Sequence, residues 1–107
     1  MAGTDLRTEA LTIALRHAPP EVGVAVWAQI VTARSKDGKT QGEVVAWVLC
    51  LTMSDPINLT GTKLCHTASI GQSAPNLALL PHEVELGVEK LRTLARQRLA
   101  ADKAQQS

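Results

Sequence analysis

Two long Val-rich runs, residues 22–34 and 41–53, flank a short polar segment that contains Asp37-Gly38. β-Branched side chains pack well on a pleated surface and are enriched in strands. Asp-Gly is favoured in tight hairpin loops because glycine adopts a positive φ freely and aspartate tolerates one. The sequence therefore predicts a β-hairpin with strands at about 22–34 and 41–53.

The length of the hairpin loop decides how the two strands pair. A two-residue type I′ loop places Val26 opposite Leu49. A three-residue loop with a bulge shifts the register by one residue and places Trp27 opposite Trp47. We favour the two-residue loop because it collects the bulky side chains on one face. That face carries Val24, Val26, Ala28, Ile30, Val45, Trp47, Leu49 and Leu51, and the other carries Ala25, Trp27, Gln29, Val31, Val44, Ala46, Val48 and Cys50.

Two segments have the three- and four-residue spacing of amphipathic helices. The first, at about 5–17, begins at a capping residue, Thr4 or Asp5, and ends before two consecutive prolines. The second, at about 82–103, has acidic residues early and basic residues late, the order that suits the helix dipole. Its apolar stripe consists of Val84, Val88, Leu91, Ala95 and Leu99, with Leu94 beside it.

The remaining segment completes a small α+β fold. Residues 63–70 alternate apolar and polar side chains and predict a third strand. Residues 71–81, which include Pro75 and Asn76, predict an extended connection over the surface. A chain of 107 residues has the size of one domain. We therefore expect a single α+β domain over 1–107, in which the N-terminal helix and the long C-terminal helix pack on one face of a hairpin plus third strand.

The second face of this sheet has no predicted cover. It carries four large apolar side chains, Trp27, Val31, Val44 and Val48. Exposed apolar patches of several hundred Å² are rare on monomers and usually mark an interface. The sequence therefore predicts a homo-oligomer that associates through these four residues, with another protein as a further partner.

Residues able to perform chemistry are few and do not stand at chelating or catalytic spacings. The chain has two cysteines and three histidines, with no Cys-x-x-Cys and no His-x-x-x-His, so we expect no metal site. Cys50 and Cys65 are expected to be reduced and buried. Gly38-Lys39-Thr40 fits a turn better than a phosphate-binding loop, so no cofactor is predicted, and no catalytic residue is assigned.

Two other functions compete with the interaction protein. Polar side chains gather near residues 65–76 and favour, as the first alternative, a small-molecule-binding module or small enzyme, because loops often carry sites. The candidate pocket residues are Cys65, His66, Ser69, Gln72, Ser73 and Asn76. The second alternative is nucleic-acid binding through the basic C-terminal helix, which a net charge of +1 and the lack of Tyr and Phe make less favourable.

The leading interpretation is a non-enzymatic interaction or assembly protein, a small homo-oligomeric adaptor or structural subunit. The first residues lack the basic and apolar regions of a signal peptide, and the longest apolar runs are shorter than the roughly 20 residues that span a bilayer. We expect a cytoplasmic protein with no membrane contact. A viral or phage assembly component, located in the virion, would also fit.

Overall fold

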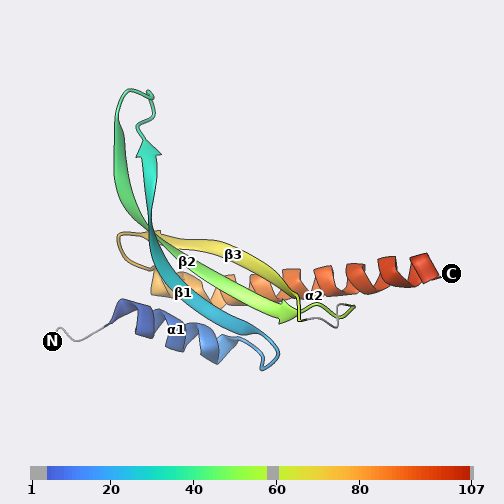
Figure 1. The fold of residues 1–107 in the computed structure, drawn as a ribbon. Helices are drawn as coiled ribbons and strands as arrows, with labels where there is room; N and C mark the ends of the chain where they lie inside the picture. Colours follow the sequence, from blue (N-terminus) through green and yellow to red (C-terminus); the bar gives the residue numbers. More distant parts are fainter. Residues whose placement is uncertain (1–4, 58–60, 107) are drawn as a thin grey trace.

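The computed structural model describes residues 5–57 and 61–106 and has an α+β fold (Figure 1). Along the chain, α1 (Leu6–His17) is followed by β1 (Gly23–Arg34), β2 (Gln41–Ser54) and β3 (Lys63–Gln72), then by a 3-10 helix η1 (Leu77–Leu79) and α2 (Leu80–Gln106). The strands form one antiparallel sheet in the order β1-β2-β3. The predicted fold class and the order of its helices and strands are confirmed.

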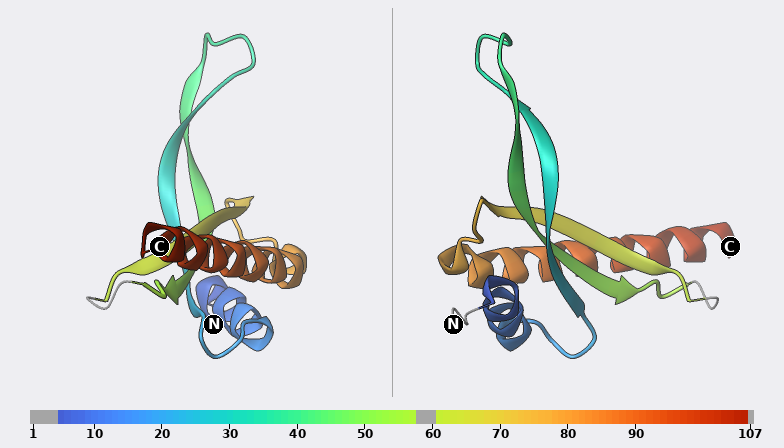
Figure 2. Two further views of the ribbon diagram at one scale, coloured as in Figure 1. Left: turned by 90° about the vertical axis from the view of Figure 1, so that its right-hand side faces the viewer. Right: turned by 60° about the vertical axis from the view of Figure 1, so that its left-hand side comes forward.

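Both helices pack on one face of the sheet, as predicted (Figure 2). Asp5 caps α1, since its carboxylate accepts a hydrogen bond from the Arg7 amide at 3.0 Å. α1 contributes Ala10 and Ala14 to the core. The sheet and α2 supply the other fully buried large side chains, Val26, Leu49, Leu51, Ile70, Leu80, Val84 and Leu91.

The predicted register is confirmed, but the predicted loop type is wrong. Val26 pairs with Leu49, and Ala28 pairs with Trp47. The ladder closes with a hydrogen bond from Ser35 N to Thr40 O at 2.8 Å, which leaves four residues in the loop. Among the described residues Gly38, at φ 74°, is the loop position with a positive φ, whereas a type I′ turn requires two. The register survives because two-residue and four-residue loops centred on the same peptide bond align the same pairs.

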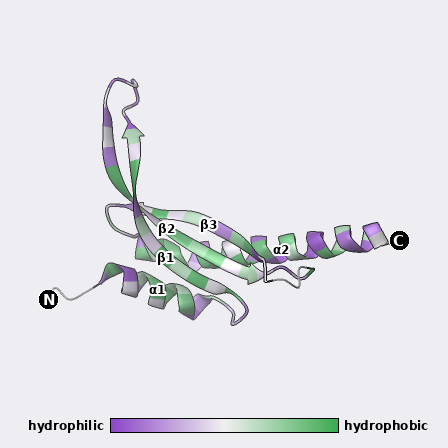
Figure 3. Ribbon diagram, viewed as in Figure 1, coloured by the Kyte–Doolittle hydropathy of each residue, from purple (hydrophilic) through white to green (hydrophobic). Residues whose placement is uncertain are grey.

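The distal half of the hairpin projects from the body of the molecule as a two-stranded arm (Figure 1). Among the described residues β3 pairs with β2 from Ala46 to Ser54, so the arm, residues 30–45, has no third strand. Ile30 is 68% exposed and Val45 is 38% exposed. These two residues of the bulky face are therefore not covered, because the helices end before they reach the arm. Figure 3 shows hydrophobic residues on the lower part of the arm and hydrophilic residues at its tip.

The segment between β3 and α2 is more buried than the sequence predicts. Pro75 and Leu80 are buried, so residues 71–81 do not simply cross the surface. The backbone N–H of Asn76 donates to Ile70 O at 2.6 Å. The side-chain oxygen of Asn76 accepts from Ala78 N at 3.1 Å and so caps η1. Capping satisfies backbone donors at the start of the helix, and this lets the segment fold back under the sheet.

The C-terminal half of α2 extends past the sheet. Val84, Val88 and Leu91 of its apolar stripe are buried as predicted, but Leu99 is 50% exposed. An ion pair, in which Arg98 donates to Asp55 Oδ2 at 2.7 Å, connects this half to the end of β2. The Asp55 side chain is only 2% exposed and also accepts a hydrogen bond from Ile57 N. The guanidinium of Arg98 therefore lowers the pKa of Asp55.

Replacement Asp55→Asn is expected to lower the melting temperature by several degrees at neutral pH. The pKa of Asp55 is lower in the folded chain than its ordinary value of about 3.9, so the ion pair stabilises the fold above that value. As the pH falls through the folded pKa, this stabilisation is lost, and the difference between wild type and variant should shrink. Thermal melts from neutral pH down to about pH 2 test this.

The matched control is Glu21→Gln. Glu21 pairs with Arg92 at 2.9 Å, but both side chains are about half exposed. Exposed ion pairs contribute little because water screens them. Equal losses in the two variants would show that burial of Asp55 does not strengthen its ion pair.

Candidate functional site

The sheet surface opposite the helices, here called the open face, is free of charged side chains over its central part. The pairing registers place twelve residues there, none of them Asp, Glu, Lys or Arg. They are Ala25, Trp27, Gln29, Val31, Val44, Ala46, Val48, Cys50, Thr52, Cys65, Thr67 and Ser69. Neither helix lies on this face (Figure 2).

All four predicted interface residues lie on the open face. Trp27 pairs with Val48, and Val31 pairs with Val44, so the four form two cross-strand pairs with the Gln29–Ala46 pair between them. Each is half-buried by its neighbours within the sheet. The Trp27 indole N–H donates to the Gln29 side chain at 3.3 Å, which leaves the ring lying on the surface.

A shallow hollow of about 280 Å³ lies beside Trp27 on this face. Its lining includes Val48 from β2 and the small polar residues Thr67 and Ser69 from β3. A large apolar side chain beside a hollow that is lined by small side chains is typical of a protein interface. An apolar side chain of a partner can fit into such a hollow. The open face therefore has both an aromatic anchor and a space for another.

The structure separates the six residues of the predicted small-molecule pocket. Successive residues of a strand point to opposite faces, so Cys65 and Ser69 lie on the open face and His66 on the helix-covered face. A Cβ added to Gly87 of α2 would lie 2.8 Å from His66 Cδ2, so the imidazole lies directly against this helix. Gln72 and Ser73 are exposed at the end of β3, and Asn76 caps η1. His66 lines a hollow together with residues of α2, whereas Ser69 lines the hollow beside Trp27 on the opposite face.

The expectation that both cysteines are buried is wrong. Cys65 is exposed and Cys50 is half-buried, and both are free thiols. They lie at diagonal positions on the open face, because Cys50 pairs with Thr67 and Cys65 pairs with Thr52. Burial, and the nearby Cys65, raise the pKa of Cys50. A raised pKa reduces the thiolate fraction, so Cys50 does not have the character of an activated nucleophile.

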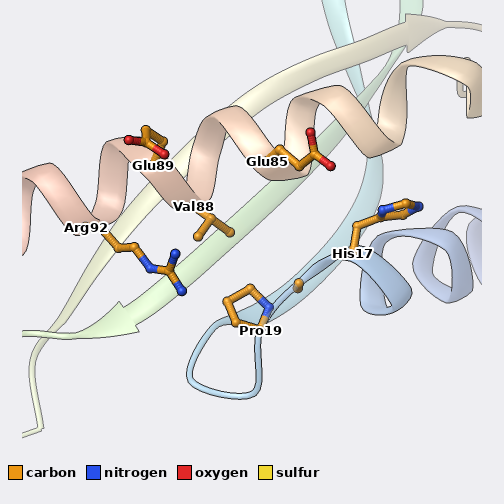
Figure 4. A pocket seen from close by; sticks show the side chains of 7 residues that line it. His17, Pro19, Glu85, Val88, Glu89 and Arg92 are labelled. Atoms are coloured by element: carbon orange, nitrogen blue, oxygen red, sulfur yellow. The ribbon is translucent and has the colours of Figure 1, made fainter.

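A cleft between α1 and α2, with a volume of about 380 Å³, was not foreseen from the sequence (Figure 4). His17 and Pro19 line one side, and Glu85 and Arg92 of α2 line the other. The hydrogen bond from Arg92 lowers the pKa of Glu21 at the edge of this region. Periodicity identifies each helix but not how two helices meet, so no sequence signal would have found this cleft.

Neither the cleft nor the rest of the described chain shows a metal centre. Over residues 5–57 and 61–106, no three His, Cys, Asp or Glu side chains gather where they could hold a metal ion. The basic residues of α2 are also partly engaged within the chain: Arg92 pairs with Glu21, and Arg98 pairs with Asp55.

Comparison of the chain with protein-family models, with curated proteins and with solved structures finds no match. Neither helix in the described part of the chain has the continuous apolar stretch that crossing a membrane requires.

Proposed function

We propose that this protein is a non-enzymatic assembly subunit that associates with copies of itself through the open face. The observation that carries the proposal is the twelve-residue, charge-free surface centred on Trp27 and Val48. Interface cores are depleted in charged residues and enriched in aromatic ones. On this face the half-buried valines would surround the Trp27 anchor and exclude water from it.

A second copy of the chain is the partner that this chemistry favours. A partner recognised by charge would require complementary charges on the open face, and its twelve residues carry none. In a two-fold dimer the same patch lies on both sides, so the Trp27 ring of one copy could enter the hollow beside Trp27 of the other. A repeated subunit of a larger assembly, such as a virion, would use the same contact.

Replacement Trp27→Glu is expected to dissociate the oligomer. The variant removes the aromatic anchor and places one charge per copy in a face that has no counter-charge, so we expect the dissociation constant to rise by about 30-fold or more. Sedimentation or light scattering over a wide concentration range should show wild type above the monomer mass of 11.4 kDa and the variant at a lower mass than wild type.

The matched control is Leu15→Glu. Leu15 is also an exposed apolar residue, but it lies on α1 and away from the open face. Its substitution should leave the mass of the oligomer unchanged. A wild type that stays monomeric at all concentrations would contradict the proposal, and so would equal dissociation by both variants.

A further inference from the structure

The backbone of the arm exposes a regular row of unpaired groups along the outer edge of β1. Two hydrogen bonds fix the orientation of the strand: Arg7 Nε, from α1, donates to Val26 O at 2.9 Å, and Ser35 N donates to Thr40 O within the hairpin. In an antiparallel pair, successive residues point their N–H and C=O groups alternately toward and away from the partner strand. The odd-numbered residues of β1 therefore bond to β2, and the even-numbered ones point outward.

Three outward-facing residues, Ala28, Ile30 and Thr32, lie between the Arg7 contact and the charged end of the strand. Over the described chain, no hydrogen bond reaches their N–H or C=O groups from outside the hairpin. Exposed edges are usually protected by proline, charge or a bulge. The stretch from Trp27 to Ala33 contains no charged residue, no proline and no glycine, and its pairing with β2 has no irregularity.

We propose that this edge pairs with the same edge of a second copy, so that two sheets join through β1 into one continuous sheet. Antiparallel pairing of identical edges is symmetric about a two-fold axis, so it needs no other partner. Arg7 already bonds to the carbonyl of Val26, so the ladder is formed by the next three outward-facing residues, Ala28, Ile30 and Thr32. A symmetric ladder is centred on the middle one, Ile30. Ala28 then pairs with Thr32 of the partner subunit, and Ile30 pairs with Ile30 of the partner subunit.

The exposed apolar side chains of the arm favour pairing with a second copy of the chain. An isolated two-stranded hairpin is marginally stable in water, and this arm has no third strand. Edge pairing would supply one and would place the 68% exposed Ile30 against its own symmetry mate. The open faces of the two copies would then form one wider surface. The inference rests on the proposed self-association and adds a second contact to it.

Amide hydrogen exchange, measured residue by residue at low and high protein concentration, tests this pairing. In a monomer the N–H groups of Ala28, Ile30 and Thr32 face water and exchange fast. In the edge-paired dimer they should exchange at least about tenfold more slowly, and only at high concentration. The Val31 N–H, which bonds to β2, serves as the internal reference and should be protected at both concentrations.

The variant Ile30→Pro removes one outward N–H and leaves the β1–β2 ladder intact, since proline is tolerated at a strand edge. It should abolish the concentration-dependent protection of Ala28 and Thr32, whereas Ile30→Val should retain it. The wild-type measurement does not depend on whether the proline variant folds.

The outcomes separate the two proposals. An oligomer in which the amides of Ala28, Ile30 and Thr32 stay unprotected overturns the edge pairing and leaves the open-face contact standing. Protected amides in an oligomer that Trp27→Glu does not weaken support the edge and overturn the open-face contact. A monomer at all concentrations overturns both. If the Trp27→Glu variant has a lower mass than wild type but its amides at Ala28, Ile30 and Thr32 stay protected, both contacts are supported.

Discussion

Replacement Leu49→Ala is expected to lower the free energy of unfolding by about 2–5 kcal/mol. Leu49 is fully buried at the centre of the sheet, where it pairs with Val26 on β1 and Ala68 on β3. Truncation removes buried methyl groups and leaves a cavity that the central strand cannot close without disturbing two ladders. Because a domain of this size has about 5–15 kcal/mol of stability, the loss is a large fraction of the total.

Urea denaturation measures this effect, and Leu99→Ala provides the control. Leu99 carries the same side chain, but it is 50% exposed on the part of α2 that extends past the sheet. Its truncation should change stability by less than about 0.5 kcal/mol. Similar midpoints for the two variants would mean that the helices do not cover Leu49.

Replacement Gly71→Ala is expected to destabilise the fold by at least about 2 kcal/mol. Gly71 lies at the irregularity in the β2–β3 ladder and has φ 143°. A Cβ there would overlap the carbonyl oxygen of Ala74 and would lie 3.2 Å from the Asn76 nitrogen. Both are backbone atoms of the segment that folds under the sheet, so they cannot rotate away as a side chain can.

Substitutions at two other glycines separate the two causes of this loss of stability, the strained backbone and the overlap with Ala74. Gly61 has φ 94° but open space around its Cβ position, so Gly61→Ala should cost only about 1–2 kcal/mol for the strained backbone. Gly42 has neither a positive φ nor a neighbour within 4 Å, so Gly42→Ala should be neutral or stabilising by up to about 1 kcal/mol. If Gly71→Ala cost no more than Gly61→Ala, the overlap with Ala74 would play no part.

The sequence predicted the elements well because their signals are local. Val-rich runs with a central Asp-Gly specify a hairpin, and the spacing of Val84, Val88 and Leu91 specifies a helix. The open face and its residues Trp27 and Val48 also followed from the period-two alternation once the register was chosen. The register was correct even though the loop type was not, because it depended on which face collected the bulky side chains.

The candidate pocket at residues 65–76 shows where local reasoning fails. Neighbours along a strand are close in sequence but lie on opposite faces, so His66 and Cys65 are divided by the sheet itself. The close approach of Gly87 to His66 and the cleft beside His17 depend on how α2 lies across the sheet. A periodic pattern defines the apolar side of a helix, not the residues it meets there.

The sequence by itself determined the order of elements, the strand register and the composition of the open face, because hydrogen-bond ladders and side-chain periodicity act over a few residues. Only the tertiary structure decided which of these apolar residues are covered. Val26 and Ile30 alternate identically on β1, yet one is buried and the other is 68% exposed. The difference arises because burial depends on where the helices end relative to the strands, and that depends on contacts between residues far apart in the chain.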